Sequence, residues 1–117
     1  MKQITPEAYL RDYPCSVTAL ACALGELPVD VEDYMERLKE DGYASLETAN
    51  KYIRANLDIK KRITYKKGER PSLKNLHLKD CAIVCVRGHF LYLEKETYYS
   101  FHDNSNDEVV CVWIIED

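Results

Sequence analysis

The segment YPCSVTALACALG, residues 13 to 25, places a cysteine directly behind a proline and then continues with small or apolar residues for about three helical turns. A helix over about residues 14 to 25 would be apolar on every side, and helices of that kind lie at the centre of a fold. Pro14 suits the first position of a helix, where its missing N–H would have no partner. The sequence therefore predicts a central helix with Cys15 among the free backbone donors at its start.

The rest of the chain indicates helices first and strands second. The apolar spacing in VDVEDYMERLKEDG and in SLETANKYIRANL predicts two amphipathic helices, with Asp30 and Ser45 as their N-caps. After Pro71 and a short helical turn in SLKNL, short links predict an antiparallel meander packed on the helices, an α+β fold with one domain over residues 1–117. The expected strands are 81–86, 89–94, 98–102 and 108–115, with 63–67 as an additional candidate.

Composition narrows the classes of protein to consider. The chain has 117 residues, of which 46% are hydrophobic and 31% charged, as in one soluble globular domain. A net charge of −4 argues against a nucleic-acid or anionic-membrane partner. No apolar run reaches the ~18 residues of a membrane span and the N-terminal segment lacks a secretory signal, so we expect a cytoplasmic protein. We expect a solvated hairpin or loop at the local run of basic residues, Lys60, Lys61, Arg62, Lys66 and Lys67.

The five cysteines show no paired framework in their spacing, so we expect free thiols in a reducing compartment. Cys22 and Cys111 lie within apolar patterns and are expected to be buried. A zinc site is suggested by the even spacing of His77, Cys81, Cys85 and His89. On a strand, however, residues four apart are separated by about 13 Å, which is too far to share an ion. No metal or cofactor is therefore predicted.

Cys15 is the candidate nucleophile, since the positive end of a helix favours a thiolate over a thiol. A cysteine nucleophile needs a base and a third group that orients the base. His89 opens a strand directly after Gly88, and Asp103 ends the next strand; adjacent strands lie about 4.8 Å apart, so these side chains can meet. His102 is a rival base, but it points to the opposite face from Asp103 if the strand alternates regularly.

Together these segments resemble a small papain-like cysteine peptidase, close to compact phage-encoded members and more distantly to the peptidase domains that process bacteriocin leaders. The resemblance spans most of the chain and rests on the helix CSVTALACALG, the helix after it, the link SLKNL, the segment CAIVCVRGHFLYL with its histidine after glycine, and YYSFHDNS. It implies a papain-like fold, a protein or peptide substrate, and a triad of Cys15, His89 and Asp103, with Asn104 as the alternative orienting residue.

The chain also departs from the papain-like pattern at two positions. Tyr9 stands where these enzymes usually carry a glutamine that helps to bind the oxyanion, and Pro14 stands where relatives often have a small or acidic residue. Because the resemblance covers most of the chain, a hydrolase is still the first hypothesis. The second is a protein that kept the papain-like fold, lost the chemistry and acts as a protein-binding module.

Overall fold

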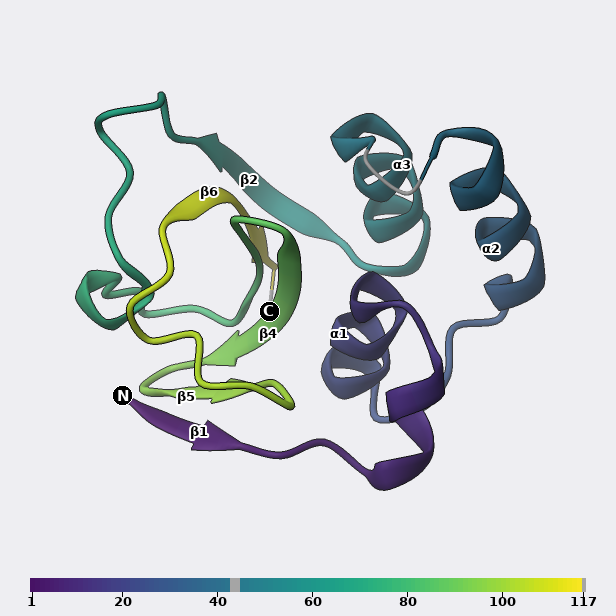
Figure 1. The fold of residues 1–117 in the computed structure, drawn as a ribbon, viewed down its shortest axis with the longest axis horizontal. Helices are drawn as coiled ribbons and strands as arrows, with labels where there is room; N and C mark the ends of the chain where they lie inside the picture. The colour runs from purple at the N-terminus through teal and green to yellow at the C-terminus, as the bar shows by residue number, and fades with distance from the viewer. Residues whose placement is uncertain (43–44, 117) are drawn as a thin grey trace.

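The computed structural model describes residues 1–42 and 45–116, which form three α-helices, two 3-10 helices and a six-stranded sheet (Figure 1). The predicted α+β class is confirmed. The helical elements are η1 (Ala8–Asp12), α1 (Cys15–Leu24), α2 (Val31–Glu40), α3 (Leu46–Asn56) and η2 (Leu73–Asn75). The strands are β1 (Lys2–Ile4), β2 (Ile59–Thr64), β3 (Ala82–Val86), β4 (His89–Glu94), β5 (Thr97–Tyr99) and β6 (Val109–Ile115).

The sheet has the strand order β1-β5-β4-β3-β6-β2 and is mixed, because β1 runs parallel to β5 while the other neighbours are antiparallel. The expected meander holds from β3 to β5 and is wrong for β6, which pairs with β3. The outer edge of β5 is already occupied by β1, so the chain after β5 crosses to the free edge of β3. The crossing segment, residues 100–108, passes the end of the sheet where β4 begins.

Side chains alternate between the two faces of the sheet, and each face has its own core. Figure 1 shows the three α-helices gathered on one side of the sheet. There α1 packs on β3 and β4, and Ile83, Tyr92 and Trp113 face the helices. On the opposite face Val84, Leu91 and the other buried strand residues pack with Leu73 and Leu76, which come from the segment around η2.

Helix α1, which carries Cys15, begins and ends within one residue of its expected bounds. Pro14 occupies the N-cap position, one residue before the place predicted for it, and Cys15 is the first helical residue. Gly25 ends α1 in the left-handed region with φ of 78°, where a glycine is favoured because it has no Cβ. The predicted cap of α3 is confirmed, because Ser45 Oγ accepts a hydrogen bond from Thr48 N at 3.2 Å.

All five cysteines are free. Cys111 is fully buried, as predicted, and faces Cys85 across the β3–β6 pair. Cys22 is only half-buried and lines a hollow together with Leu10 of η1 and Tyr99 of β5. Burial raises the pKa of the Cys22 thiol to about 11, with a smaller contribution from Glu7.

Of the basic residues expected in a solvated hairpin or loop, Lys66 and Lys67 lie in the loop after β2, whereas Lys60, Lys61 and Arg62 lie on β2 itself. Lys60 and Lys61 are exposed. Arg62 differs from its neighbours because its guanidinium lies over the Trp113 ring, 5.3 Å from the centroid, and reaches Glu47 at 3.4 Å. Among the described residues, no helix is long and apolar enough to span a bilayer.

Candidate active site

Strand β4 brings its first residues against the start of α1. The backbone N–H of Phe90 donates a hydrogen bond to the Cys15 sulfur at 3.4 Å, which links the helix to the strand that carries His89. Cys15 is half-buried and lies in the first helical turn, whose backbone N–H groups have no partner within the helix. The sequence thus places a polarisable thiol next to a set of free donors.

His89 is held by a chain of hydrogen bonds that starts at its Nε2 atom. Ser100 Oγ lies 3.1 Å from Nε2 and 2.5 Å from Asn104 Oδ1, and Asn104 Nδ2 donates to Asp107 Oδ2 at 2.7 Å. The Ser100 hydroxyl has one proton, which it donates to the Asn104 carbonyl oxygen, so it accepts from Nε2–H of His89. This assigns the proton of neutral His89 to Nε2 and leaves the lone pair of Nδ1 available.

Burial lowers the pKa of His89 from its ordinary value of 6.5. The neighbouring His102 lowers the pKa further, and Asp107 acts in the opposite direction. The imidazole is therefore neutral at neutral pH, which is the state that a general base requires.

Asp103, the predicted orienting residue, lies in a different set of contacts. Its Oδ1 accepts hydrogen bonds from Ser105 N at 3.0 Å, Ser105 Oγ at 2.6 Å and Tyr98 OH at 3.1 Å, and the side chain is exposed. Hydrogen bonds from Ser105, and then from Tyr98, lower the pKa of Asp103. Asn104, the alternative, is buried in the network behind His89. Ser100, which makes the direct contact with the imidazole, was not predicted.

His102, the rival base, lies beside His89 with the ring centroids 5.9 Å apart and the rings nearly perpendicular. It is exposed, and its backbone N–H donates to Ser100 Oγ at 3.2 Å. Of the two rings, only that of His89 is hydrogen-bonded to the Ser100 side chain among the described residues.

Two hollows of the surface meet at the cysteine, with volumes of about 250 and 360 Å³. Cys15, His89 and Phe90 line both of them. Among the hydrogen bonds between described residues, none joins the imidazole directly to the Cys15 sulfur. Contacts of this kind are often long in an enzyme without substrate, and the two residues share one cleft where a reacting group can lie between them.

Neither Tyr9, which stands at the position of the papain-like glutamine, nor Gln3 lines the Cys15 cleft. Tyr9 is 49% exposed and lines another hollow, next to Cys22, so it contributes nothing at the Cys15 cleft. Gln3 lies on β1 and its Nε2 donates to the backbone carbonyl of Ser100 at 2.9 Å. The only glutamine of the chain therefore supports the loop that holds His89 rather than an oxyanion.

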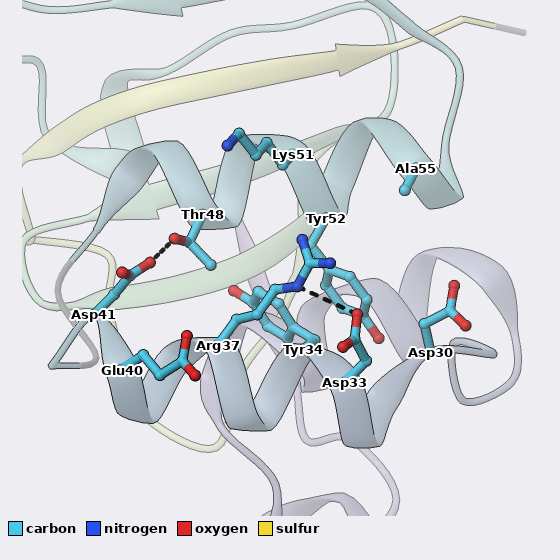
Figure 2. A pocket seen from close by; sticks show the side chains of 10 residues that line it. All are labelled: Asp30, Asp33, Tyr34, Arg37, Glu40, Asp41, Thr48, Lys51, Tyr52 and Ala55. Carbon is cyan, nitrogen blue, oxygen red and sulfur yellow. Dashed lines mark hydrogen bonds and ion pairs between the residues drawn. The ribbon is translucent and has the colours of Figure 1, made fainter.

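A further hollow of about 460 Å³ lies between α2 and α3 and has a different character (Figure 2). Figure 2 shows Arg37 paired with Asp33, at 3.2 Å, and Thr48 bonded to Asp41. Arg37 and Asp33 both belong to α2, whereas Thr48 of α3 bonds to Asp41, the residue that follows α2. In the described part of the chain, no group of three His, Cys, Asp or Glu residues is arranged for a metal ion.

Comparison of the chain with family models, curated proteins and solved structures gives no match. The functional proposal therefore rests on the residues themselves. Cys15 and His89, predicted from sequence, line one cleft, and the loop from Ser100 to Asp107 fixes the imidazole.

Proposed function

We propose that the chain is a papain-like cysteine hydrolase that acts on an amide or thioester carbonyl of a protein or peptide, with Cys15 as nucleophile and His89 as base. The observation that carries this proposal is that His89 shares the cleft of Cys15 while Ser100 fixes its Nε2. A neutral imidazole in this orientation has its second nitrogen, Nδ1, free to take a proton.

The proposed reaction has two steps that follow from this arrangement. In the first, the Cys15 sulfur bonds to the carbonyl carbon and His89 takes the thiol proton. The proton then passes to the leaving nitrogen of an amide, or the leaving sulfur of a thioester, as the bond from that atom to the carbonyl carbon breaks. In the second, His89 takes a proton from water, the hydroxide attacks the thioester, and the released sulfur regains its proton. The backbone N–H of Cys15 would stabilise the oxyanion in both steps.

A second function, a protein-binding module without turnover, is favoured by one observation. The papain-like glutamine is replaced by Tyr9, whose side chain lies away from the cleft, so one oxyanion donor is missing. Losing such a donor typically costs about 100- to 1,000-fold in rate. The free thiols of the chain fit a reducing, cytoplasmic setting under either function.

The reactivity of Cys15 towards iodoacetamide tests the hydrolase proposal. Under native conditions, peptide mapping should find Cys15 labelled well before Cys22, Cys81, Cys85 and Cys111. His89→Ala should slow this labelling while the circular dichroism spectrum stays native, and Ser105→Ala is the matched control. A Cys15 that reacts no faster than a solvent-exposed thiol would contradict the proposal. Rapid labelling without turnover of any peptide would favour the binding module.

A further inference from the structure

The two hollows that meet at Cys15 differ in chemistry, and the difference bears on what the cleft accepts. Neither is lined by an aspartate or glutamate among the described residues, although the chain as a whole has a net charge of −4. The smaller hollow, here called the cationic hollow, lies between η1 and the loop after β5 and is lined by Arg11, Tyr13, Tyr99, Phe101 and His102. The larger, here called the apolar hollow, lies between β3, α2 and α3 and is lined by Leu38, Leu46, Ala49, Val86 and Val110.

One guanidinium and one imidazole line the cationic hollow. The Arg11 guanidinium lies over the Phe101 ring, 4.6 Å from the centroid, which holds it at the edge of the hollow. Among the described residues Arg11 makes no ion pair, so its donors are available to a ligand. His102 lines the same hollow and is exposed. A guanidinium matches a carboxylate with two parallel hydrogen bonds.

The apolar hollow is lined by aliphatic side chains of four elements, α2, α3, β3 and β6. Leu38 of α2 and Ala49 of α3 are buried, and Val86 ends β3 directly before the turn that leads to His89. Arg87, in that turn, is the charged residue of its lining, and it is exposed. Its volume of about 360 Å³ is enough for one large aliphatic or aromatic side chain.

From this arrangement we infer that the substrate carries an aliphatic or aromatic group on one side of the reacting carbonyl and a carboxylate on the other. The inference rests on the proposed function and specifies its substrate class. The apolar group occupies the apolar hollow, and the carboxylate pairs with Arg11 and His102. The carbonyl then lies at the junction of the hollows, beside Cys15 and His89.

Alkylation by iodoacetate and iodoacetamide tests the carboxylate part without requiring turnover. The two reagents deliver the same carbon, and only iodoacetate carries a carboxylate. The measured quantity is the rate of Cys15 alkylation by iodoacetate divided by the rate with iodoacetamide, normalised to the same ratio for free cysteine. This normalised ratio should be about 10 and should fall at high salt. This result would oppose the repulsion expected from the chain's net charge of −4, so it reports a local effect.

Variants assign the carboxylate preference to its residues. Arg11→Gln should lower the normalised ratio towards unity, and His102→Gln should lower it in part. Lys74→Gln removes the same charge from an exposed residue of η2, on the other side of the sheet, and should leave the ratio unchanged. A wild-type ratio at or below unity, or equal changes in Arg11→Gln and Lys74→Gln, would overturn this part of the inference.

The apolar part is tested with N-alkyl iodoacetamides of increasing length. Because each buried CH₂ is favourable by roughly 0.8 kcal/mol in transfer, the rate at Cys15 should rise several-fold from N-methyl to N-butyl. Leu46→Ser should remove most of the rise, with the melting temperature as the control for folding. A rate that does not depend on chain length would contradict an apolar hollow that binds the substrate.

Unlabelled peptides distinguish the two sources of a carboxylate. Peptides with an acidic residue beside an apolar one, in both orders, are compared with their glutamine or asparagine analogues, and peptides with a free C-terminus are compared with C-terminal amides. Cleavage that depends on the side chain assigns an internal acidic residue, and cleavage that depends on the free terminus assigns the terminal carboxylate. Cleavage of every analogue at equal rates would overturn the inference but not the hydrolase. Selective alkylation without cleavage would leave the ligand class standing and contradict the hydrolase.

Discussion

The Nε2 atom of His89 lies 3.1 Å from the hydroxyl oxygen of Ser100, and this contact fixes which imidazole nitrogen can act as the base. Ser100 in turn donates to Asn104, so a loop residue that is four positions further along supports the orientation. The histidine is thus oriented through a hydroxyl rather than directly by a carboxylate.

Removing the Ser100 hydroxyl should therefore impair His89 more than it impairs folding. Ser100→Ala frees the imidazole to rotate, and misplacement of a catalytic group by about 1 Å can cost about 100-fold in rate. We expect a 10- to 100-fold slower alkylation of Cys15, about the scale that this principle sets. Ser105→Ala is the control, because the Ser105 side chain contacts Asp103 and not His89. Equal rates in Ser100→Ala and in wild type would contradict the role given to this hydroxyl.

Two alanine variants test whether Asp103 or Asn104 orients His89. Asn104 is buried and joins Ser100 to Asp107, whereas Asp103 is exposed and bonds to Ser105 and Tyr98. We expect a larger loss of Cys15 reactivity in Asn104→Ala than in Asp103→Ala. The reverse order would restore Asp103 as the orienting residue. Thermal melting of both variants separates this effect from a loss of stability.

The lowered pKa of His89 sets the pH dependence of the reaction. A base with a pKa below 6.5 stays neutral at mildly acidic pH, so the rate should fall only when the pH drops below that value. His102→Gln removes the second cause of the shift, which should raise the pKa of His89 and move the acid limb of the rate profile to higher pH. An acid limb at the same pH in wild type and His102→Gln would contradict the electrostatic coupling of the two rings.

The same shift predicts how stability varies with pH. The unfolded chain binds a proton at His89 more readily than the folded chain does, so the free energy of unfolding should decrease as the pH falls from about 6.5 through the lower folded-state pKa. Above about 6.5 both states are neutral at this position, and the contribution is constant. Urea titrations of wild type and His89→Gln should differ in slope against pH within this window and agree above it.

Two stacked tyrosines beneath the α2–α3 hollow should respond oppositely to loss of their hydroxyls. The rings of Tyr34 and Tyr52 lie 3.7 Å apart, yet only Tyr34 OH has a partner, Ser16 Oγ at 3.0 Å. The Tyr52 side chain is 7% exposed and its hydroxyl has no hydrogen-bond partner among the described residues.

Burying an unsatisfied hydroxyl costs about 1–3 kcal/mol, so Tyr52→Phe should raise the free energy of unfolding by an amount of that order. Tyr34→Phe should lower it by about 1 kcal/mol, because Ser16 loses its partner. Urea denaturation measures both values. A destabilising Tyr52→Phe would mean that the hydroxyl has a partner, such as a bound water, and would remove the reason for the expected gain.

Local periodicity predicted the helices well and the sheet order poorly. The apolar spacing of α1, α2 and α3 is a property of short windows, and their observed ends fall close to the expected ones. Strand β1 has three residues and no alternating pattern, and it forms because its backbone pairs with Thr97 to Tyr99. Because β1 occupies the edge of β5, β6 pairs with β3 instead. A pairing of this kind cannot be predicted from the residues of a short window.

The position of Asp103, away from His89, has a similar origin. The expected link between β4 and β5 had three residues, whereas Glu94 pairs with Thr97 and only Lys95 and Glu96 turn the chain, Lys95 with φ of 56°. Continuing that register places His102, not Asp103, opposite His89, since a slip of one residue exchanges the faces of a strand. The strand then ends at Tyr99, before the register would bring Asp103 to the sheet, and the loop turns Ser100 towards the imidazole.

Strand β1 has a consequence for the order of folding. Gln3 and Ser100 are 97 positions apart in sequence, and pairing between such distant segments is slow to form because it requires closing a large loop. We therefore expect Cys15 to acquire its reactivity in the last stage of folding, after the chain between β1 and β5, residues 5–96, has been synthesised. The chain can also be divided into two fragments at the exposed Gly68 turn. Neither fragment then contains both Cys15 and His89. Recovery of rapid alkylation on mixing the fragments would then serve as a signal of their association.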